Sequence, residues 1–528
     1  MSEITNEESI EKENKREKES IPEETKCERE NQKDYNVPPI SKLEFAFYLL
    51  IWVFIVLRGV YEIYKLTNNK KTQKQFLKNG FIQKGSFGLY KSNNEYLWNE
   101  LMELFVKGAV PFTFYIFISK LLRSYTSPKM FMFGNLLITW YFNYYYSSAK
   151  FFQMEVLIFL TFAIAGLFRH KSLIWIIGCL SLYSMKYMPA YSFYKQYYLF
   201  HNSFPYLAVL FTRAISVGLT ISEAPKYDMK LVLEMSFYFW YFPAIIGCRL
   251  MVIKEFINNI YKPCVIEDWK EWLFSSVRIA AYIFIWNIVM HYCHIYLTIA
   301  THDWQNKHIV VACGVQMFYG IHYYMVYIIF YKSSYLITQL DGFLTAPGPE
   351  CIVHIALYSR MWRNFDVALH LWLKDHVFRP IAKLGPFRIT RYFAAIACFA
   401  FVVNFHGLRR DNLYWISLSI FQYTAENILK YIFLFTCVGP YLEKTFSPIW
   451  LRRLIAAAVA ASFYSSVWAF AAFQYGIPIA NALYFSSLNK SFSWLVERFI
   501  TGSAFIYSHA QISLTVNEYL RKRKLKTA

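Results

Sequence analysis

A histidine and an aspartate are the residues of this chain best suited to acid–base chemistry. His406 follows an apolar run in CFAFVVNFHGLRRD, and Asp366 lies among apolar neighbours in MWRNFDVALHLWLKDHVFRP. Ionisable side chains in such surroundings are costly and mark functional positions. A neutral imidazole can accept a proton, whereas a buried carboxyl must be paired or protonated. The structural alternatives are a histidine that caps a helix end and an Asp366–Arg363 salt bridge.

Helical spacing predicts which residues accompany these two. On a continuous helix, Trp362, Asp366 and His370 share one face at four-residue steps, beside an apolar face. Gly407 follows His406, and its missing side chain would let a substrate or another backbone come close. These residues therefore form the main candidate site.

Two cysteine-containing segments are weaker candidates. Cys351 follows the rigid bend at residues 347–349; a thiolate there could be a nucleophile or a ligand, although a buried cysteine is more often inert packing. His291, Cys293 and His294 lack obvious third and fourth ligands, so no metal site is predicted. The chain has no P-loop, GxGxxG, GxSxG or HExxH motif, which leaves nucleotide hydrolysis and zinc peptidase chemistry without support.

The composition places these residues in a membrane protein. Of 528 residues, 56% are apolar and 20% aromatic, only 17% are charged, and the mean hydropathy is +0.25. An ordinary soluble enzyme is excluded, as are collagen-like, disordered and disulfide-scaffold chains. The net charge of +20 suits cytosolic loops and could attract an anionic cosubstrate. Nucleic acid is not a predicted partner, because no soluble basic module accompanies the charge.

The chain divides into a short charged tail and one long apolar region. Residues 1–40 are rich in Glu and Lys and predict a disordered tail. Residues 41–528 predict a single all-α polytopic membrane domain of about ten to twelve membrane segments, beginning with a run of about 20 apolar residues from Leu43. Residues 333–391 are too rich in Pro, Gly and charge for a span, so irregular backbone, and a site, are expected there.

The orientation signals of the sequence conflict. The basic C-terminus RKRKLKTA predicts a cytosolic end and resembles a dilysine retrieval signal of the endoplasmic reticulum, although a plain charged helix end is an equal alternative. The sequon Asn489-Lys490-Ser491 then falls in a lumenal loop, where it is usable. The lysine-rich loop after the first span argues for the opposite orientation if the N-terminus is cytosolic.

Six ordered blocks give the chain a family resemblance. The blocks are FYLLIWVFIVLRGVYEIYK, YFPAIIGCRLMVIKEFI, LDGFLTAPGPEC, MWRNFDVALHLWLKDHVFRPI, NFHGL and FIYSHAQI, and the motif-bearing region covers about 241–410. With these blocks the chain resembles the membrane-bound O-acyltransferase (MBOAT) superfamily, and within it the hedgehog acyltransferase branch. The fold implied is a helical membrane bundle with re-entrant segments around a transverse tunnel.

The resemblance also implies roles for single residues. It places a catalytic histidine at His406, its acidic partner at Asp366, a substrate-binding gate beside the acyl tunnel at Trp362, and a haem b thiolate at Cys351. The chain departs from the family pattern where Gly385 stands alone in place of a Gly-Gly hairpin and where Phe405 and Leu408 flank the histidine turn. These departures concern the tunnel lining and hence the preferred acyl chain.

The implied activity is transfer of a fatty acyl group, palmitoyl, from acyl-CoA to the N-terminal amine of a secreted hedgehog-type protein, on a cysteine. His406 would act as the base. The implied location is the endoplasmic reticulum membrane or the Golgi, with several spans. Three alternatives stay open: an acyltransferase for a lipid or a serine hydroxyl, a non-catalytic scaffold, and a transporter with Asp366 and His406 as a proton relay.

Overall fold

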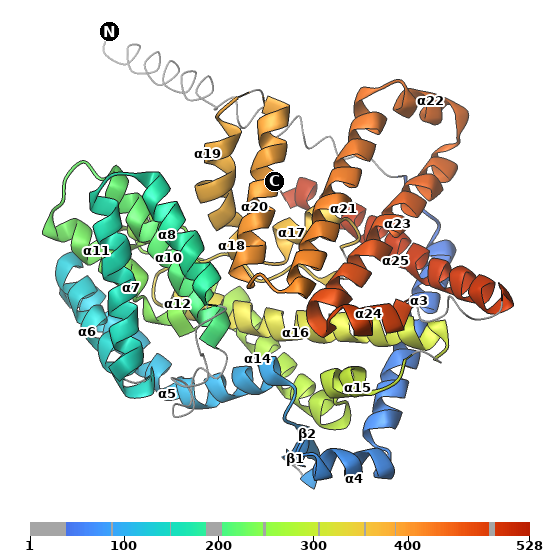
Figure 1. Ribbon diagram of the computed structural model, residues 1–528, viewed down its shortest axis with the longest axis horizontal. Helices are drawn as coiled ribbons and strands as arrows, with labels where there is room; N and C mark the ends of the chain where they lie inside the picture. Colours follow the sequence, from blue (N-terminus) through green and yellow to red (C-terminus); the bar gives the residue numbers. More distant parts are fainter. Residues whose placement is uncertain are drawn as a thin grey trace.

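Helices make up most of the chain that the structure describes. The computed structural model describes residues 38–527 except 86–87, 148, 186–202, 247–249, 305–306, 353–354, 386 and 485–491. Within these ranges the strands form one antiparallel hairpin, β1 (Ile82–Lys84) and β2 (Tyr90–Ser92), with Ile82 opposite Ser92 (Figure 1). The predicted all-α class is confirmed. The predicted tail lies almost wholly outside the described residues.

Seven of the described helices are long and apolar enough to cross a membrane. They cover Lys42–Thr67, Leu97–Tyr125, Ala149–Leu167, Tyr206–Glu223, Trp269–Thr301, Ile309–Leu340 and Pro448–Tyr475. Two shorter apolar helices, Lys171–Ser184 and Ile389–Phe405, accompany them. The polytopic membrane class is therefore confirmed, while the total of ten to twelve segments, the re-entrant helices and the tunnel stay predictions.

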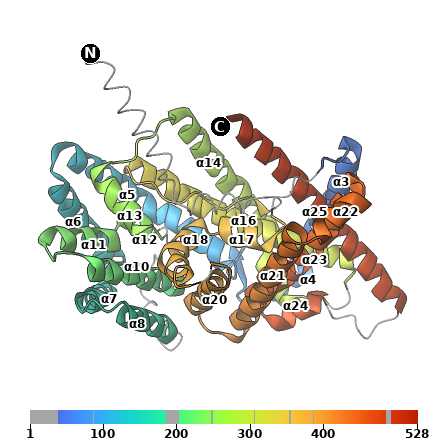
Figure 2. The same cartoon turned by 90° about the horizontal axis from the view of Figure 1, so that it is seen from above.

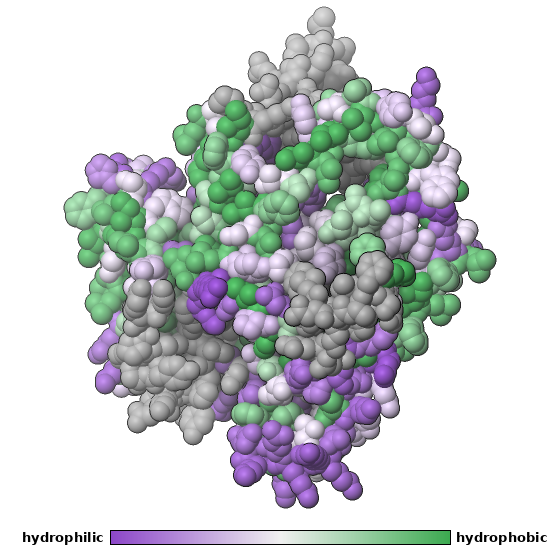
Figure 3. Space-filling view, turned by 45° about the vertical axis from the view of Figure 1, so that its right-hand side comes forward, coloured by the Kyte–Doolittle hydropathy of each residue, from purple (hydrophilic) through white to green (hydrophobic). Residues whose placement is uncertain are grey.

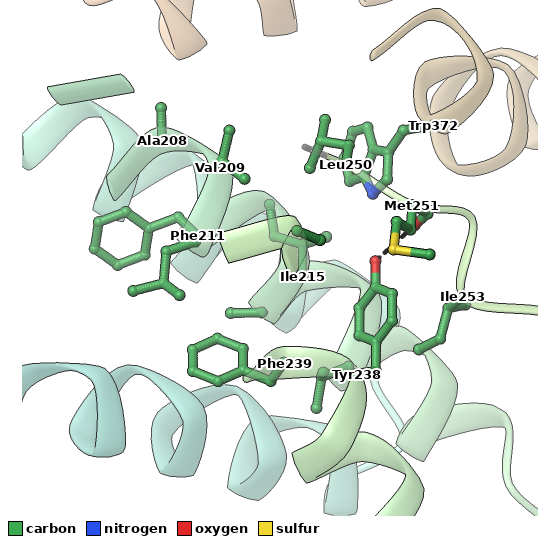
Figure 4. Close-up of a cluster of buried hydrophobic side chains, with 14 of the residues drawn as sticks. Ala208, Val209, Phe211, Ile215, Tyr238, Phe239, Leu250, Met251, Ile253 and Trp372 are labelled. Atoms are coloured by element: carbon green, nitrogen blue, oxygen red, sulfur yellow. Dashed lines mark hydrogen bonds between the residues drawn. The ribbon is translucent and has the colours of Figure 1, made fainter. Parts of the chain in front are cut away.

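One half of the molecule packs around α10 (Figure 1). Its helices are α5 (Tyr96–Tyr125), α6 (Pro128–Ser147), α7 (Ala149–Leu167), α8 (Lys171–Ser184), α10 (Ser203–Glu223), α11 (Met229–Phe239), α12 (Phe242–Ile246) and α13 (Ile253–Tyr261). Close-packed side chains of α10 and α11 form its core, where the Tyr238 hydroxyl donates to the Met251 carbonyl at 2.8 Å (Figure 4). Burial of such aliphatic and aromatic side chains stabilises this half.

The other half surrounds the long helix α16. Its elements are α3 (Lys42–Thr67), α4 (Lys70–Lys78), α14 (Trp269–Tyr292), α15 (Ile295–Thr301), α16 (Ile309–Leu340), α21 (Arg410–Phe435), α22 (Val438–Thr445), α23 (Pro448–Tyr475), α24 (Ile477–Tyr484) and α25 (Phe492–Thr527). Helices α3 and α16 cross where Gly59 meets Gly314, and a Cβ on either glycine would overlap the backbone of the partner helix. Small residues let membrane helices approach this closely.

A run of short helices joins the two halves. It contains α17 (Tyr358–Asn364), α18 (Val367–Leu373), a π-helical turn (Lys374–Phe378), α19 (Arg379–Ala382) and the longer α20 (Phe387–Phe405). Seen from above, α16, α17 and α18 lie in the middle of the molecule (Figure 2). Buried Trp372 of α18 donates from Nε1 to the Ser216 hydroxyl of α10 at 2.7 Å. Helices α17 to α19 fall in the region 333–391 that the sequence predicted to be irregular, whereas α20 extends beyond it to Phe405.

The two ends of α3 define two sides of the molecule. Near its beginning, Trp52 donates to His509 of α25 at 3.2 Å, and Arg452 of α23 bridges the Pro38 carbonyl and Thr515 of α25. The other end of α3 leads to α4 and the hairpin, which form the hydrophilic lower end of the molecule in Figure 3. The last turns of α25 thus lie on the side where α3 begins, opposite the lysines of α4.

Candidate functional site

His406 lies in a turn that directly follows helix α20. Its backbone N–H still donates to the Val402 carbonyl at 3.0 Å, and the next residue, Gly407, has a φ of +77°. A side chain is strained in that left-handed region, whereas glycine adopts it freely. Gly407 therefore ends the helix and turns the chain away immediately after the histidine.

Asn412 of α21 holds this turn in place. Its side-chain N–H group donates to the carbonyls of both His406 and Gly407, each at 2.7 Å. Asn412 is itself buried. Carbonyls at a helix C-terminus lack intrahelical partners, so this amide satisfies the His406 carbonyl and adds a second donor to the Gly407 carbonyl, which also accepts from the Arg409 N–H at 2.7 Å.

Three aromatic rings surround the His406 imidazole. The ring centroids of Phe405, Trp415 and Phe473 lie 5.2, 5.4 and 5.3 Å away, and each ring meets the imidazole nearly edge to face. The histidine is partly buried. Apolar surroundings disfavour an imidazolium, so they favour the neutral ring that a general base requires.

Asp366 lies at a break between two helices, which corrects the prediction of one continuous helix. Helix α17 ends at Asn364, and Asp366 is the N-cap of α18, where its Oδ1 accepts from the Leu369 N–H at 3.0 Å. Aspartate is among the favoured N-cap residues because its carboxylate satisfies an unpaired helix N–H. Trp362 and Asp366 therefore do not share one helix face.

The second oxygen of Asp366 faces helix α16. Its Oδ2 accepts a hydrogen bond from the Tyr331 hydroxyl at 3.0 Å. Arg363, the partner expected for a simple salt bridge, donates from Nε to the Ser359 carbonyl at 3.3 Å. Asp366 is thus held from its own helix and from a helix that is distant in the sequence.

Trp362 reaches the histidine through one intervening ring. Its indole stacks on Trp415 at 5.4 Å and 21°, and meets Phe399 at 5.0 Å. Trp415 also contacts His406. The structure therefore groups Trp362 and His406 around Trp415, while Asp366 is held by Tyr331 and Leu369, a different set of partners.

Cys351 lies on a loop that is fastened to α17. The neighbouring Glu350 carboxylate accepts from Arg360 Nε at 3.1 Å, and the Glu350 N–H donates to the Asn364 carbonyl at 2.9 Å. The thiol is partly exposed and lies near Tyr324 of α16. Cysteine is one of the residues that can hold haem iron, and this thiol is accessible from outside.

The weaker histidine pair contacts backbone oxygens. His291 Nδ1 lies 2.7 Å from the Asn287 carbonyl, and His294 Nε2 lies 3.3 Å from the Tyr90 carbonyl. Within the described ranges no group of three His, Cys, Asp or Glu side chains could hold a metal ion.

Two curated proteins match this chain over about half of its length. Mouse protein-cysteine N-palmitoyltransferase HHAT (Mus musculus) is 22% identical over 289 residues, which are 52% of this chain and 56% of that protein. Protein-cysteine N-palmitoyltransferase Rasp of Drosophila melanogaster is 22% identical over 253 residues, 47% of each chain. The chain resembles protein-cysteine N-palmitoyltransferases. It spans about half the length of these curated relatives, and no family model matches it.

The resemblance predicted from the six sequence blocks is therefore confirmed. Four supporting residues were missed by the sequence reasoning: Tyr331, Asn412, Trp415 and Phe473. Only the first carried a readable signal, because the tyrosines of α16 recur every four residues at 319, 323, 327 and 331, on one helix face.

Proposed function

We propose that this chain is an acyltransferase that moves a palmitoyl group from palmitoyl-CoA to the N-terminal amine of a secreted protein whose first residue is cysteine. The observation that carries the proposal is the similarity to two proteins named protein-cysteine N-palmitoyltransferases. The apolar spans and the aromatic surroundings of His406 support the proposal, because an acyl donor and a base must meet in apolar surroundings.

In this reaction the amine nitrogen attacks the thioester carbonyl. An α-amine has a pKa of about 7.7–8.0, so it is largely protonated at neutral pH and must lose a proton to attack. That proton passes to solvent; as the neutral amine attacks and the C–N bond forms, His406 takes a second proton from the nitrogen, the C–S bond breaks, and the CoA thiolate leaves and takes this proton from the imidazolium. Asp366 orients the amine or stabilises the charge that develops during attack.

The acyl chain is bound by burial. About fourteen methylenes at roughly 0.8 kcal/mol each contribute on the order of 11 kcal/mol before ordering costs. Trp362 is the proposed wall of this acyl site, since its indole packs among Phe399 and Trp415 beside the histidine. The multi-pass protein would reside in the membrane of the endoplasmic reticulum or Golgi, where anionic CoA and a lumenal acceptor reach opposite sides.

The deciding experiment uses microsomes, labelled palmitoyl-CoA and two peptides, one with a free N-terminal Cys and one with that amine acetylated. Labelling of the free peptide alone, abolished by His406→Ala and retained by His302→Ala at the C-cap of α15, is expected. Equal labelling of both peptides, or of lipid alone, would support the hydroxyl or lipid alternative. Activity that survives His406→Ala would contradict the role of the histidine.

The alternatives without acyl transfer predict other results. A scaffold would bind the acceptor but leave both peptides unlabelled. A transporter would carry protons across proteoliposomes without labelling either peptide. Neither result is compatible with the proposed reaction.

Haem b at Cys351 is a separable part of the proposal. When bound, the haem would be held by Cys351 and would supply redox-active iron. A Soret band is expected for the purified protein, with its loss in Cys351→Ala and its retention in the matched Cys398→Ala. A protein without the band, or a band that Cys351→Ala leaves unchanged, would remove haem from the proposal while leaving acyl transfer untouched.

A further inference from the structure

The tyrosine face of α16 contacts the break between α17 and α18. Phe365, the residue before Asp366, stacks on Tyr323 with ring centroids 5.5 Å apart and an angle of 11°, and meets Tyr327 at 5.2 Å. The hydroxyl of Tyr323 donates to that of Tyr327 at 2.9 Å. One turn further along, Tyr331 donates to Asp366. Three successive turns of one helix thus contact two successive residues of the break.

Helix α16 is a firm support for these contacts. Most of its apolar window is buried, and it crosses α3 without space for a side chain at Gly314. Tyr331 itself is almost fully buried, with the Tyr327 and Phe330 rings 5.5 and 5.7 Å away. A side chain packed in this way has few rotamers available, so its hydroxyl is aimed at a fixed point.

We infer that Tyr331 is a positioning residue for the proposed acyl transfer, holding the Asp366 carboxylate in one orientation and in its ionised form. The inference rests on the proposed function, in which Asp366 acts on the amine. One carboxylate oxygen is occupied by the N–H of its own helix, and the Tyr331 hydroxyl fixes the other. A hydrogen bond to the charged form of an acid favours that form. A correctly held group also avoids the loss of rate that misplacement causes.

Other charged groups near the break lie on α17, on α18 and at the start of the π-helical turn. Arg363 lies one turn before Asp366, and its guanidinium is engaged by the Ser359 carbonyl. His370 lies one turn after Asp366, and burial together with Arg363 and Lys374 lowers the pKa of its imidazole to about 4, so that it is neutral near pH 7.

The test compares Tyr331→Phe, which removes one oxygen, with Tyr335→Phe, the matched change one turn along α16. The Tyr335 hydroxyl accepts from Gln339 at 2.9 Å, so the control variant Tyr335→Phe also loses a hydrogen bond. We expect Tyr331→Phe to lower kcat by about 10- to 100-fold, as for loss of a hydrogen bond to a charged group, with little change in KM for palmitoyl-CoA. In the pH–rate profile of Tyr331→Phe, the acidic limb should move to higher pH.

A second readout is independent of activity. A hydrophobic carbodiimide modifies protonated carboxyls, so mass spectrometry can follow its labelling of Asp366 in the full-length protein as a function of pH. Tyr331→Phe should shift the midpoint of labelling to higher pH, and Tyr331→His, which retains a ring donor, should shift it less. An inactive wild type with this shift would reject the proposed function but keep the positioning role. An unchanged midpoint and rate profile in Tyr331→Phe would overturn the inference.

Discussion

The position of His406 depends on its backbone as much as on its ring. The side chain meets three aromatic rings, but the turn that presents it depends on the positive φ of Gly407 and on the amide of Asn412. A glycine after the histidine was visible in the sequence, whereas an asparagine six residues further on gave no sign of its role. The hydrogen bonds of Asn412 run to backbone carbonyls, which no residue pattern displays.

Replacing Asn412 tests the importance of this turn. Asn412→Ala should lower acyl transfer at least tenfold, because the imidazole loses its fixed position, and should cost about 1–3 kcal/mol of stability, because the His406 carbonyl loses its donor and the Gly407 carbonyl keeps only the Arg409 N–H. The measurements are turnover with the free-Cys peptide and thermal unfolding in detergent. Asn427→Ala is the matched control, since Asn427 is an exposed residue of α21 that donates to the Tyr423 carbonyl. Equal effects of both variants would contradict a special role for Asn412.

At the scale of the helices, α16 links the packing of the bundle to the site. Its early turns cross α3 through two facing glycines, and its later turns carry the tyrosines that meet Phe365 and Asp366. Helix α18 is fixed at its other end by Trp372, whose indole reaches α10. The break before α18 is therefore held from both halves of the molecule.

The glycine crossing offers a direct test of this packing. Gly314→Ala should lower thermal stability by about 1–3 kcal/mol, the usual cost of overpacking, because the new methyl overlaps the α3 backbone. Gly320→Ala on the same helix is the control, since its methyl would meet only Ile352 at 3.5 Å, an ordinary contact. Thermal unfolding in detergent measures both. A stability of Gly314→Ala equal to that of the control would show that α3 and α16 do not cross as described.

At the scale of the whole molecule, the structure defines which segments lie on the same side. The basic end of α25 lies on the side where α3 begins, and α4 lies opposite. The basic C-terminus and the lysine-rich segment after the first span therefore indicate opposite orientations in the folded protein as well. If the C-terminus is cytosolic, the lysines of α4 face the lumen.

A glycosylation assay measures the orientation. Asn489 lies outside the described residues, between α24 and α25. In microsomes, we expect a glycan on the wild type that endoglycosidase H removes and that Asn489→Gln prevents, because only a lumenal sequon is modified. A tag at the C-terminus should be digested by protease added outside. A protected tag on an unglycosylated protein would show the reverse orientation.

The sequence by itself determined the class of this protein and singled out two candidate residues for its chemistry. Long apolar runs can satisfy their backbone in a membrane only as helices, so composition predicted the helical spans that the structure contains. His406 and Asp366 stood out because ionisable groups are rare in such runs, and six ordered blocks predicted the similarity that the curated relatives confirm.

Only the tertiary structure decided how those residues are held. Asp366 was expected inside one helix, but it caps a new one, and Tyr331, 35 residues earlier, donates to its second oxygen. Trp415 joins Trp362 to His406 from yet another helix. Local spacing predicts neighbours along one helix, whereas these partners come from helices brought together by burial of their apolar faces, and nothing in the spacing of residues specifies which faces meet.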